Sequence, residues 1–156
     1  PHTTPFGEDL ARLFVEARNH GCRHVVMEVS SHALEQERVA GIDFDVAAFT
    51  NLTQDHLDYH QDMESYLRAK IRLFEKVRDA LHEGTDSWSR FGVVNMEDPY
   101  APRFAAVLEG NCHTYGANGG VRAEGLRLFG DGAAFRLVSP WGEGDANIRL
   151  VGRHND

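Results

Sequence analysis

The stretch Val46-Ala47-Ala48-Phe49-Thr50 decides the fold, because a short apolar run of this kind is typical of a buried strand. It leads into Asn51-Leu52-Thr53, where polar residues end the run. Residues 63–81 follow as a long amphipathic helix. Phe91-Gly92-Val93-Val94-Asn95 then predicts another strand. A strand, a helix and a strand in this order indicate a parallel β-sheet with a helix packed against it.

The segments before this stretch continue the alternation of helix and strand. Residues 8–20 carry apolar side chains at helical spacing, and Gly21 stands where that helix should stop. Residues 24–29 form an apolar, β-branched run, which predicts a further buried parallel strand. Residues 30–34 begin with two serines, which are candidate N-caps of a short helix.

The segments after it predict a change of architecture. Asp98-Pro99 predicts the start of a helix with proline in its first turn. After Cys112, short alternating runs punctuated by glycine predict antiparallel strands. The predicted fold class is therefore α/β, a mainly parallel sheet flanked by helices with a C-terminal antiparallel β section.

Composition and charge exclude several classes of protein. The formal net charge of −8 argues against a nucleic-acid backbone as the main partner, since such sites carry a basic patch. Two cysteines among 156 residues cannot make a disulfide framework. Without a secretory signal or a long apolar run, we expect a cytoplasmic protein that does not enter a membrane.

Polar residues follow three of the predicted strands, and the carboxyl ends of parallel strands are where open α/β sheets bind ligands. Glu28 precedes Ser30 and Ser31; Asn51 precedes Asp55 and His56; Asn95 precedes Asp98. Such residues suit a site for phosphates, Mg²⁺ or both. The alternative is that each side chain merely caps the helix that follows it.

Two features of the sequence each have two interpretations. They are the run Asp55-His56-Leu57-Asp58-Tyr59-His60 and the residue Lys70. The run is dense in possible metal ligands but lacks the spacing of a zinc motif, so an ordinary polar loop remains open. Lys70 lies between Ala69 and Ile71 at the edge of the predicted apolar stripe. Partial desolvation there would favour the neutral amine, whereas a surface lysine with a packed stem is the alternative.

No Gly-x-x-x-x-Gly-Lys-[Ser/Thr] motif occurs in the sequence. The glycine-rich stretches at 116–120 and 130–132 lack the lysine of such a phosphate loop. We therefore expect no self-contained triphosphate cradle within these residues.

Several runs together resemble the Mur ligase family, in the branch that adds the third amino acid of the peptidoglycan stem peptide (MurE type). The runs agree in order and spacing from one end of the chain to the other. They are Thr3-Thr4-Pro5, Met27-Glu28-Val29-Ser30-Ser31-His32-Ala33-Leu34, Gln36-x-Arg38-Val39, Thr50-Asn51-Leu52-Thr53-Gln54-Asp55-His56-Leu57-Asp58-Tyr59-His60, Tyr66 through Lys70, and Val94-Asn95-x-x-Asp98. The last run contains one departure from the family pattern. Glu97 stands where many members carry aspartate, so the negative charge is conserved.

The resemblance implies an enzyme of three domains. Residues 1–156 would be part of the central ATP-binding domain, beginning after its phosphate loop. The N-terminal domain, which holds the uridine nucleotide, and the C-terminal domain, which holds the amino acid, would lie outside it. We expect the chain alone to be inactive and the parent enzyme to be a monomer in the bacterial cytoplasm.

The resemblance also implies roles for particular residues. Glu28 and His56 would bind Mg²⁺, and so would Lys70 after carbamylation by CO₂ to N6-carboxylysine; these three would be the catalytic residues. Asn51 and Asn95 would contact ATP. The remaining site residues would bind the muramoyl-dipeptide substrate, and they are Thr3, Thr4, Ser30, Gln36 and Arg38.

The implied reaction is ATP-dependent formation of an amide bond. The γ-phosphate of ATP would pass to the side-chain carboxylate of UDP-MurNAc-L-Ala-D-Glu, and the amine of diaminopimelate or lysine would attack the acyl phosphate. Two alternatives remain open at this point. One is a different superfamily member, such as a folylpolyglutamate synthase, and the other is a non-catalytic remnant.

Overall fold

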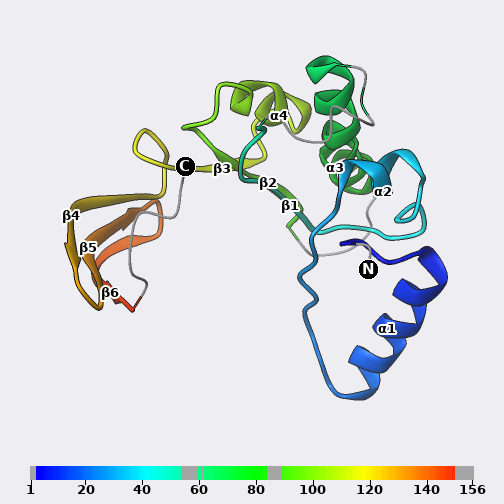
Figure 1. The fold of residues 1–156 in the computed structure, drawn as a ribbon, viewed down its shortest axis with the longest axis horizontal. Helices are drawn as coiled ribbons and strands as arrows, with labels where there is room; N and C mark the ends of the chain where they lie inside the picture. Colours follow the sequence, from blue (N-terminus) through cyan, green and yellow to red (C-terminus); the bar gives the residue numbers. More distant parts are fainter. Residues whose placement is uncertain (1–2, 54–59, 61, 84–88, 150–156) are drawn as a thin grey trace. The chain divides into compact units, whose positions relative to one another are not determined.

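The computed structural model describes residues 3–53, 60, 62–83 and 89–149. The chain divides into two compact units, the first Pro1–Ala47 with Leu52–Phe91 and the second Ala48–Asn51 with Gly92–Asp156. The first unit contains three helices, and the second contains most of the β structure (Figure 1). None of the helices in the described ranges combines the length and apolarity needed to cross a bilayer.

Helix α1, Gly7–Asn19, matches the predicted helix to within one residue at each end, and the predicted stop residue, Gly21, follows its C-cap, His20. Gly21 adopts a φ of 79°, the left-handed conformation that glycine reaches at no steric cost. Its N–H donates to the Arg18 carbonyl at 3.0 Å, and the Cys22 N–H donates to the Ala17 carbonyl at 3.0 Å. This pair of bonds is the Schellman motif, which satisfies carbonyls that the helix end would otherwise leave unpaired.

Two further helices pack against each other in the first unit. They are α2, Ser31–Glu35, and α3, Met63–Glu83. Ser30 caps α2 as predicted, because its side-chain oxygen accepts from the Ala33 N–H at 3.2 Å. Arg72 of α3 donates to the Leu34 carbonyl at 3.2 Å, which ties the two helices together. The apolar side of α3 is buried, at Tyr66, Leu67, Ala69, Phe74 and Val77.

The predicted strand over residues 24–29 is wrong for this structure. The described strands form two sheets, and neither contains these residues. Met27 and Val29 pack against the core cluster of Leu10, Leu34 and Val39, whereas the Val26 side chain is 98% exposed. An apolar run becomes a buried strand only where neighbouring strands pair with it, and the described residues provide none.

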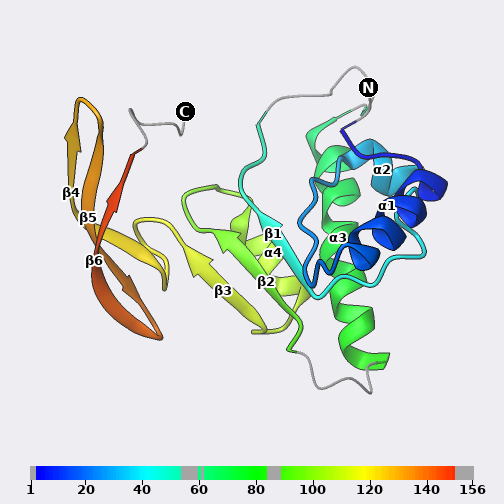
Figure 2. The ribbon, with the colours of Figure 1, turned by 90° about the horizontal axis from the view of Figure 1, so that it is seen from below.

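The first of the two sheets has three strands in the order β1-β2-β3. The strands are β1, Val46–Phe49, β2, Phe91–Asn95, and β3, Cys112–Tyr115, and their arrows point the same way in Figure 2. The parallel pairing of β2 with β3 aligns Val94 with Thr114. The first two strands were predicted, whereas β3 was not, because its sequence, Cys-His-Thr-Tyr, is not a run of apolar residues.

Helix α4, Ala101–Val107, begins later than predicted. Asp98 and Pro99 form a turn before it, in which the Asp98 carboxylate accepts from the Tyr100 N–H at 2.8 Å. The proline of the first helical turn is Pro102 instead of Pro99. The buried Phe104 of α4 stacks on Phe49 of β1, with ring centroids 3.8 Å apart.

The predicted antiparallel section is confirmed as a second sheet, in the order β4-β5-β6. Its strands are β4, Arg122–Phe129, β5, Gly132–Ser139, and β6, Gly142–Ile148. One face carries apolar cross-strand neighbours, since Ala133 lies between Leu128 and Ile148 in the register.

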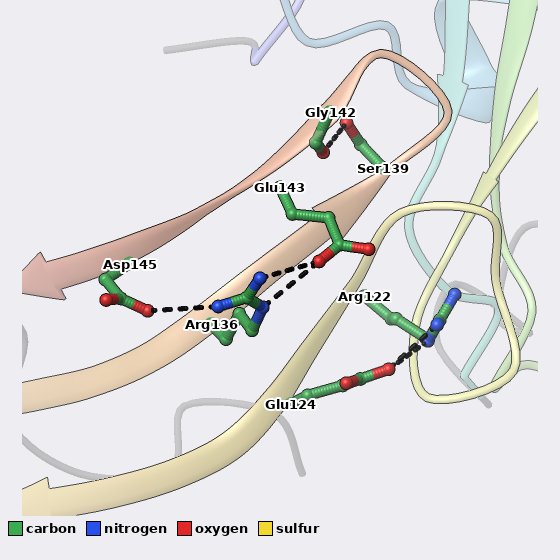
Figure 3. Close-up of polar contacts among 7 residues, drawn as sticks. All are labelled: Arg122, Glu124, Arg136, Ser139, Gly142, Glu143 and Asp145. Carbon is green, nitrogen blue, oxygen red and sulfur yellow. Dashed lines mark hydrogen bonds and ion pairs between the residues drawn. The ribbon is translucent and has the colours of Figure 1, made fainter.

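The other face of this sheet is charged (Figure 3). Arg136 forms two ion pairs, from Nη2 to Glu143 Oε2 at 2.8 Å and from Nη1 to Asp145 Oδ1 at 4.0 Å. Arg122 Nη2 lies 2.8 Å from Glu124 Oε1. The hydrogen bond to Glu143 and the nearby carboxylates raise the pKa of Arg136 above its ordinary value. These pairs are exposed to solvent, so they favour the strand register but add little stability.

A methyl group at Gly132 is expected to destabilise the β4–β6 sheet. Its Cβ would lie 2.2 Å from the Ile148 carbonyl oxygen, so β5 and β6 would have to move apart. We expect Gly132→Ala to lower the free energy of unfolding in urea by about 1–3 kcal/mol. Gly144→Ala in β6 is the matched control, because a Cβ there meets nothing within 4 Å. Equal losses in the two variants would contradict the packing argument.

Candidate functional site

Thr4 is a buried polar residue at the centre of the first unit's candidate site. Its side chain is fully buried, and its hydroxyl donates to the Glu28 carbonyl oxygen at 3.1 Å. The Thr4 hydroxyl oxygen in turn accepts from the Ser30 N–H at 3.0 Å and lies 3.5 Å from the Ser30 hydroxyl oxygen. Because a buried hydroxyl is costly unless it is hydrogen-bonded, these contacts hold residues 4 and 28–30 side by side.

Arg38 joins the same cluster from the other end of α2. Its Nη1 donates to the Thr4 carbonyl at 3.0 Å, and its Nε donates to Gln36 Oε1 at 3.0 Å. Its guanidinium carbon lies 4.3 Å from the centroid of the Phe6 ring, at cation–π distance. The fork is thus held on three sides, which orients a group suited to bidentate binding of a carboxylate.

The turn between Gln36 and Arg38 has a strained backbone that places both side chains. Glu37 has a φ of 55°, uncommon for a residue that is not glycine. Its N–H donates to the Leu34 carbonyl at 3.3 Å, and the Arg38 N–H donates to the Ala33 carbonyl at 2.9 Å. This is again a Schellman ending, here with glutamate at the left-handed position. Such strain is maintained only when the surrounding contacts determine it.

The structure therefore brings together four of the five residues predicted to bind substrate. One hydrogen-bonded network, which we call the Thr4–Arg38 network, joins Thr4, Ser30, Gln36 and Arg38. The fifth residue, Thr3, is exposed and directly precedes Thr4 in the sequence.

Glu28 and Lys70 are accessible to different degrees. Glu28 is exposed, so its carboxylate can reach a ligand while its main-chain oxygen remains bonded to Thr4. Lys70 is half-buried on α3, and its Nζ lies 5.2 Å from the centroid of the Tyr66 ring. An ammonium group is attracted to the ring face at such a distance. His56 lies outside the described residues.

The described part of the chain contains no group of three or more His, Cys, Asp or Glu side chains placed to hold a metal ion. The predicted donor set lies outside the reach of this search, since His56 is not among the described residues and a lysine becomes a metal ligand only after modification. A shallow hollow of about 290 Å³ lies beside α2 and α3, lined among others by Val39, Arg72 and Lys76. None of the predicted site residues lines this hollow.

In the second unit, Asn95 links the carboxyl ends of two strands. Its Nδ2 donates to the Thr50 carbonyl at 2.8 Å, and its Oδ1 accepts from the Glu97 N–H at 3.0 Å. Asn95 therefore connects β2 to the end of β1, whatever it contacts beyond the chain. Asn51 is exposed just beyond that point.

Glu97, the departure from the family pattern, also has a local contact. Its carboxylate accepts from the Ala117 N–H at 3.3 Å. Burial, together with the nearby Glu97 carboxylate, raises the pKa of Tyr115.

Sequence reasoning assigned no separate role to His60, which the structure buries. Its Nε2 lies 2.8 Å from the Ser31 hydroxyl, and its side chain is 2% exposed. One signal was available in the sequence. The run at residues 55–60, which is rich in possible metal ligands, ends in His60, its second histidine. Nothing in the residue spacing indicated that it would pair with Ser31, which lies 29 positions earlier.

The whole chain, residues 1–156, matches the family model of the Mur ligase middle domain. It belongs to that family. The resemblance seen in the sequence is thereby confirmed, and the parallel sheet with helices and an antiparallel section agrees with the fold of the solved Mur ligases.

Three similar proteins carry the same name, UDP-N-acetylmuramoyl-L-alanyl-D-glutamate--2,6-diaminopimelate ligase. The relative from Geobacter metallireducens is 46% identical over 99% of this chain and 30% of its own length. The relative from Bacillus licheniformis is 43% identical over 99% of this chain and 31% of its own length. A solved structure with this name has a TM-score of 0.81 at 29% identity, over 97% of this chain and 31% of that one. The Mur ligase chain described here thus spans less than a third of these relatives.

Proposed function

We propose that this chain is part of the central, ATP-binding domain of an ATP-dependent ligase. The ligase joins diaminopimelate to UDP-MurNAc-L-Ala-D-Glu in bacterial peptidoglycan synthesis. The observation that carries the proposal is the similarity to ligases of this name, at 46% and 43% identity over 99% of the chain. The proposed enzyme acts in the cytoplasm as a monomer, with its uridine-nucleotide and amino-acid domains contributed by other parts of the polypeptide.

The Thr4–Arg38 network is the proposed contact with the muramoyl-dipeptide. Arg38 supplies a fixed guanidinium, and the hydroxyl of Ser30 lies in the same network. A carboxylate of the dipeptide can pair with the remaining N–H groups of Arg38, because the guanidinium has five and three of them donate to Gln36 and Thr4. Thr3, exposed next to Thr4, extends the contact toward solvent.

The proposed metal site comprises Glu28, His56 and the carbamate of Lys70. The exposed carboxylate of Glu28 fits a hard cation, which prefers oxygen ligands. The amine of Lys70 fits carbamylation, because Lys70 is only half-buried and CO₂ can reach the amine from solvent. Bound Mg²⁺ would neutralise the charge that otherwise separates the γ-phosphate of ATP from the substrate carboxylate.

The reaction proposed for the complete enzyme has two chemical steps. The substrate's D-glutamate carboxylate takes the γ-phosphoryl group of ATP and becomes an acyl phosphate, releasing ADP. The amine of diaminopimelate then attacks the acyl carbon, and inorganic phosphate leaves. Both steps depend on positioning and on charge stabilisation more than on covalent catalysis by the protein. Asn51 and Asn95, at the ends of β1 and β2, are proposed to contact the nucleotide.

A ligation assay with the full-length enzyme tests this function. We expect phosphate release from ATP to require both UDP-MurNAc-L-Ala-D-Glu and diaminopimelate, with the amide product identified by mass spectrometry. Lysine and D-alanyl-D-alanine, offered in place of diaminopimelate, serve as controls for the amino-acid substrate. Phosphate release that does not depend on the dipeptide, or faster turnover with D-alanyl-D-alanine, would contradict the proposal.

A further inference from the structure

His60 is held by polar groups on both sides of its ring. Its Nε2 lies 2.8 Å from the Ser31 hydroxyl oxygen, and its Nδ1 lies 3.7 Å from Glu35 Oε1. Both partners belong to α2. A neutral imidazole carries one N–H and one lone pair. With the N–H of Nδ1 facing the Glu35 carboxylate, Nε2 accepts the proton of the Ser31 hydroxyl.

The arrangement has the order of a Ser–His–carboxylate triad, but it cannot act as one. The Ser31 side chain is 1% exposed and the His60 side chain is 2% exposed, so no substrate carbonyl can approach the hydroxyl. A nucleophile must be reachable by the atom that it attacks. The contacts therefore hold α2 and His60 together instead of activating the serine.

A chain of contacts leads from this pair to Lys70. The His60 ring centroid lies 5.0 Å from that of Tyr66, with the rings tilted by 32°. Tyr66 is 4% exposed, and its ring lies under the Lys70 amine at 5.2 Å. Both residues are on α3, one turn apart. The position of the Tyr66 ring therefore limits where the Lys70 amine can lie.

The same chain of contacts reaches the substrate side of α2. Ser30 caps this helix and takes part in the Thr4–Arg38 network, and Ser31 is the next residue. A single short helix thus presents Ser30 to that network and Ser31 to His60. Movement of α2 would disturb both contacts at once.

We propose that His60 is a positioning residue for Lys70. By bonding to Ser31 and packing on Tyr66, it sets the distance between α2 and the part of α3 that carries the lysine. The inference rests on the proposed function, in which the carbamate of Lys70 serves the metal site. It assigns His60 no contact with substrate or metal.

Three substitutions in the full-length ligase test this role. Glutamine can place its amide oxygen near the position of Nε2, where it can accept from the Ser31 hydroxyl. Asparagine can reach only the position of Nδ1, and phenylalanine keeps a ring without either nitrogen. The Ser31 contact is a hydrogen bond at 2.8 Å, whereas 3.7 Å to Glu35 is too long for one. We therefore expect His60→Gln to keep most of the activity. His60→Asn and His60→Phe should lose about 10- to 100-fold in kcat, as is usual for residues that orient metal ligands.

Two measurements distinguish positioning from a general loss of folding. The KM values for ATP and for the muramoyl-dipeptide should change far less than kcat. The carbamate signal of Lys70, observed by NMR after equilibration with isotopically labelled bicarbonate, should fall in His60→Asn and His60→Phe and persist in His60→Gln. His24→Asn is the matched control, because His24 is exposed in the same unit.

The outcomes separate the two proposals. If the wild-type enzyme ligates its substrates and all three variants keep its kcat and carbamate signal, the role of His60 is wrong while the proposed function stands. If His60→Phe does not fold, equal kcat and equal carbamate signal in the glutamine and asparagine variants would overturn the role. A wild-type ligase without a carbamate signal would overturn both the Lys70 assignment and this inference.

Discussion

Replacing Lys70 with alanine is expected to reduce the kcat of the complete ligase by about 100- to 1,000-fold, the usual effect of removing one oriented charge from a transition state. Lys70 is half-buried on α3, beside the fully buried Leu67 and Ala69, with its amine over the ring of Tyr66. Alanine keeps the helix but removes the amine that CO₂ would modify. Added formate or acetate should restore part of the activity, since a small carboxylate can supply the missing anionic oxygens.

The control for this variant is Lys76→Ala on the same helix. The Lys76 amine donates to the Ala40 carbonyl at 3.0 Å, at the exposed side of α3. Its removal should leave kcat unchanged and should give no response to formate. Near-normal kcat of Lys70→Ala without any additive would contradict the assignment of Lys70. The measurement is steady-state phosphate release with and without the carboxylate.

Truncating Phe104 is expected to cause the largest loss of stability, about 3–5 kcal/mol in the free energy of unfolding. The side chain is 1% exposed and stacks on Phe49, with ring centroids 3.8 Å apart and an interplanar angle of 15°. Phe104→Ala would leave a cavity between α4 and β1 and remove the stacking contact. Denaturation in urea, followed by circular dichroism, measures the change.

Phe129→Ala is the matched control for this prediction. Phe129 is 51% exposed at the end of β4, so its truncation removes little buried area. We expect a loss well below that of Phe104→Ala, and similar losses would contradict the core assignment. Because Phe49 lies two residues before Asn51, which is proposed to contact the nucleotide, we expect the Phe104 variant also to weaken nucleotide binding by the full-length ligase.

Local chemistry made the helices predictable. Apolar spacing indicated α1 and α3, and the serine before residues 31–34 indicated an N-cap that the structure contains. Gly21 was expected to end α1, and it does so through a left-handed residue and two hydrogen bonds. These features depend on residues within five positions of one another, so the sequence carries them directly.

Strand assignments were less predictable because a strand depends on its neighbours. The run at residues 24–29 is rich in valine, as a buried strand often is, yet only the run at residues 46–49 belongs to a described sheet. Conversely, β3 pairs with β2 although its sequence, Cys-His-Thr-Tyr, carried no strand signal. The start of α4 was also misplaced, because Asp98 caps a turn instead of the helix.

The sequence by itself determined the family, the long helices and the first two strands of the parallel sheet, and it supplied the candidate site residues. Each of these follows from residue type and spacing along the chain. Only the tertiary structure decided which of those residues meet. Thr4 bonds to Ser30 across 26 positions, Arg38 to Thr4 across 34, and His60 to Ser31 across 29. Contacts at such separations arise when helices bury their apolar faces, and polar groups enclosed in that process must find partners among whichever groups are enclosed with them.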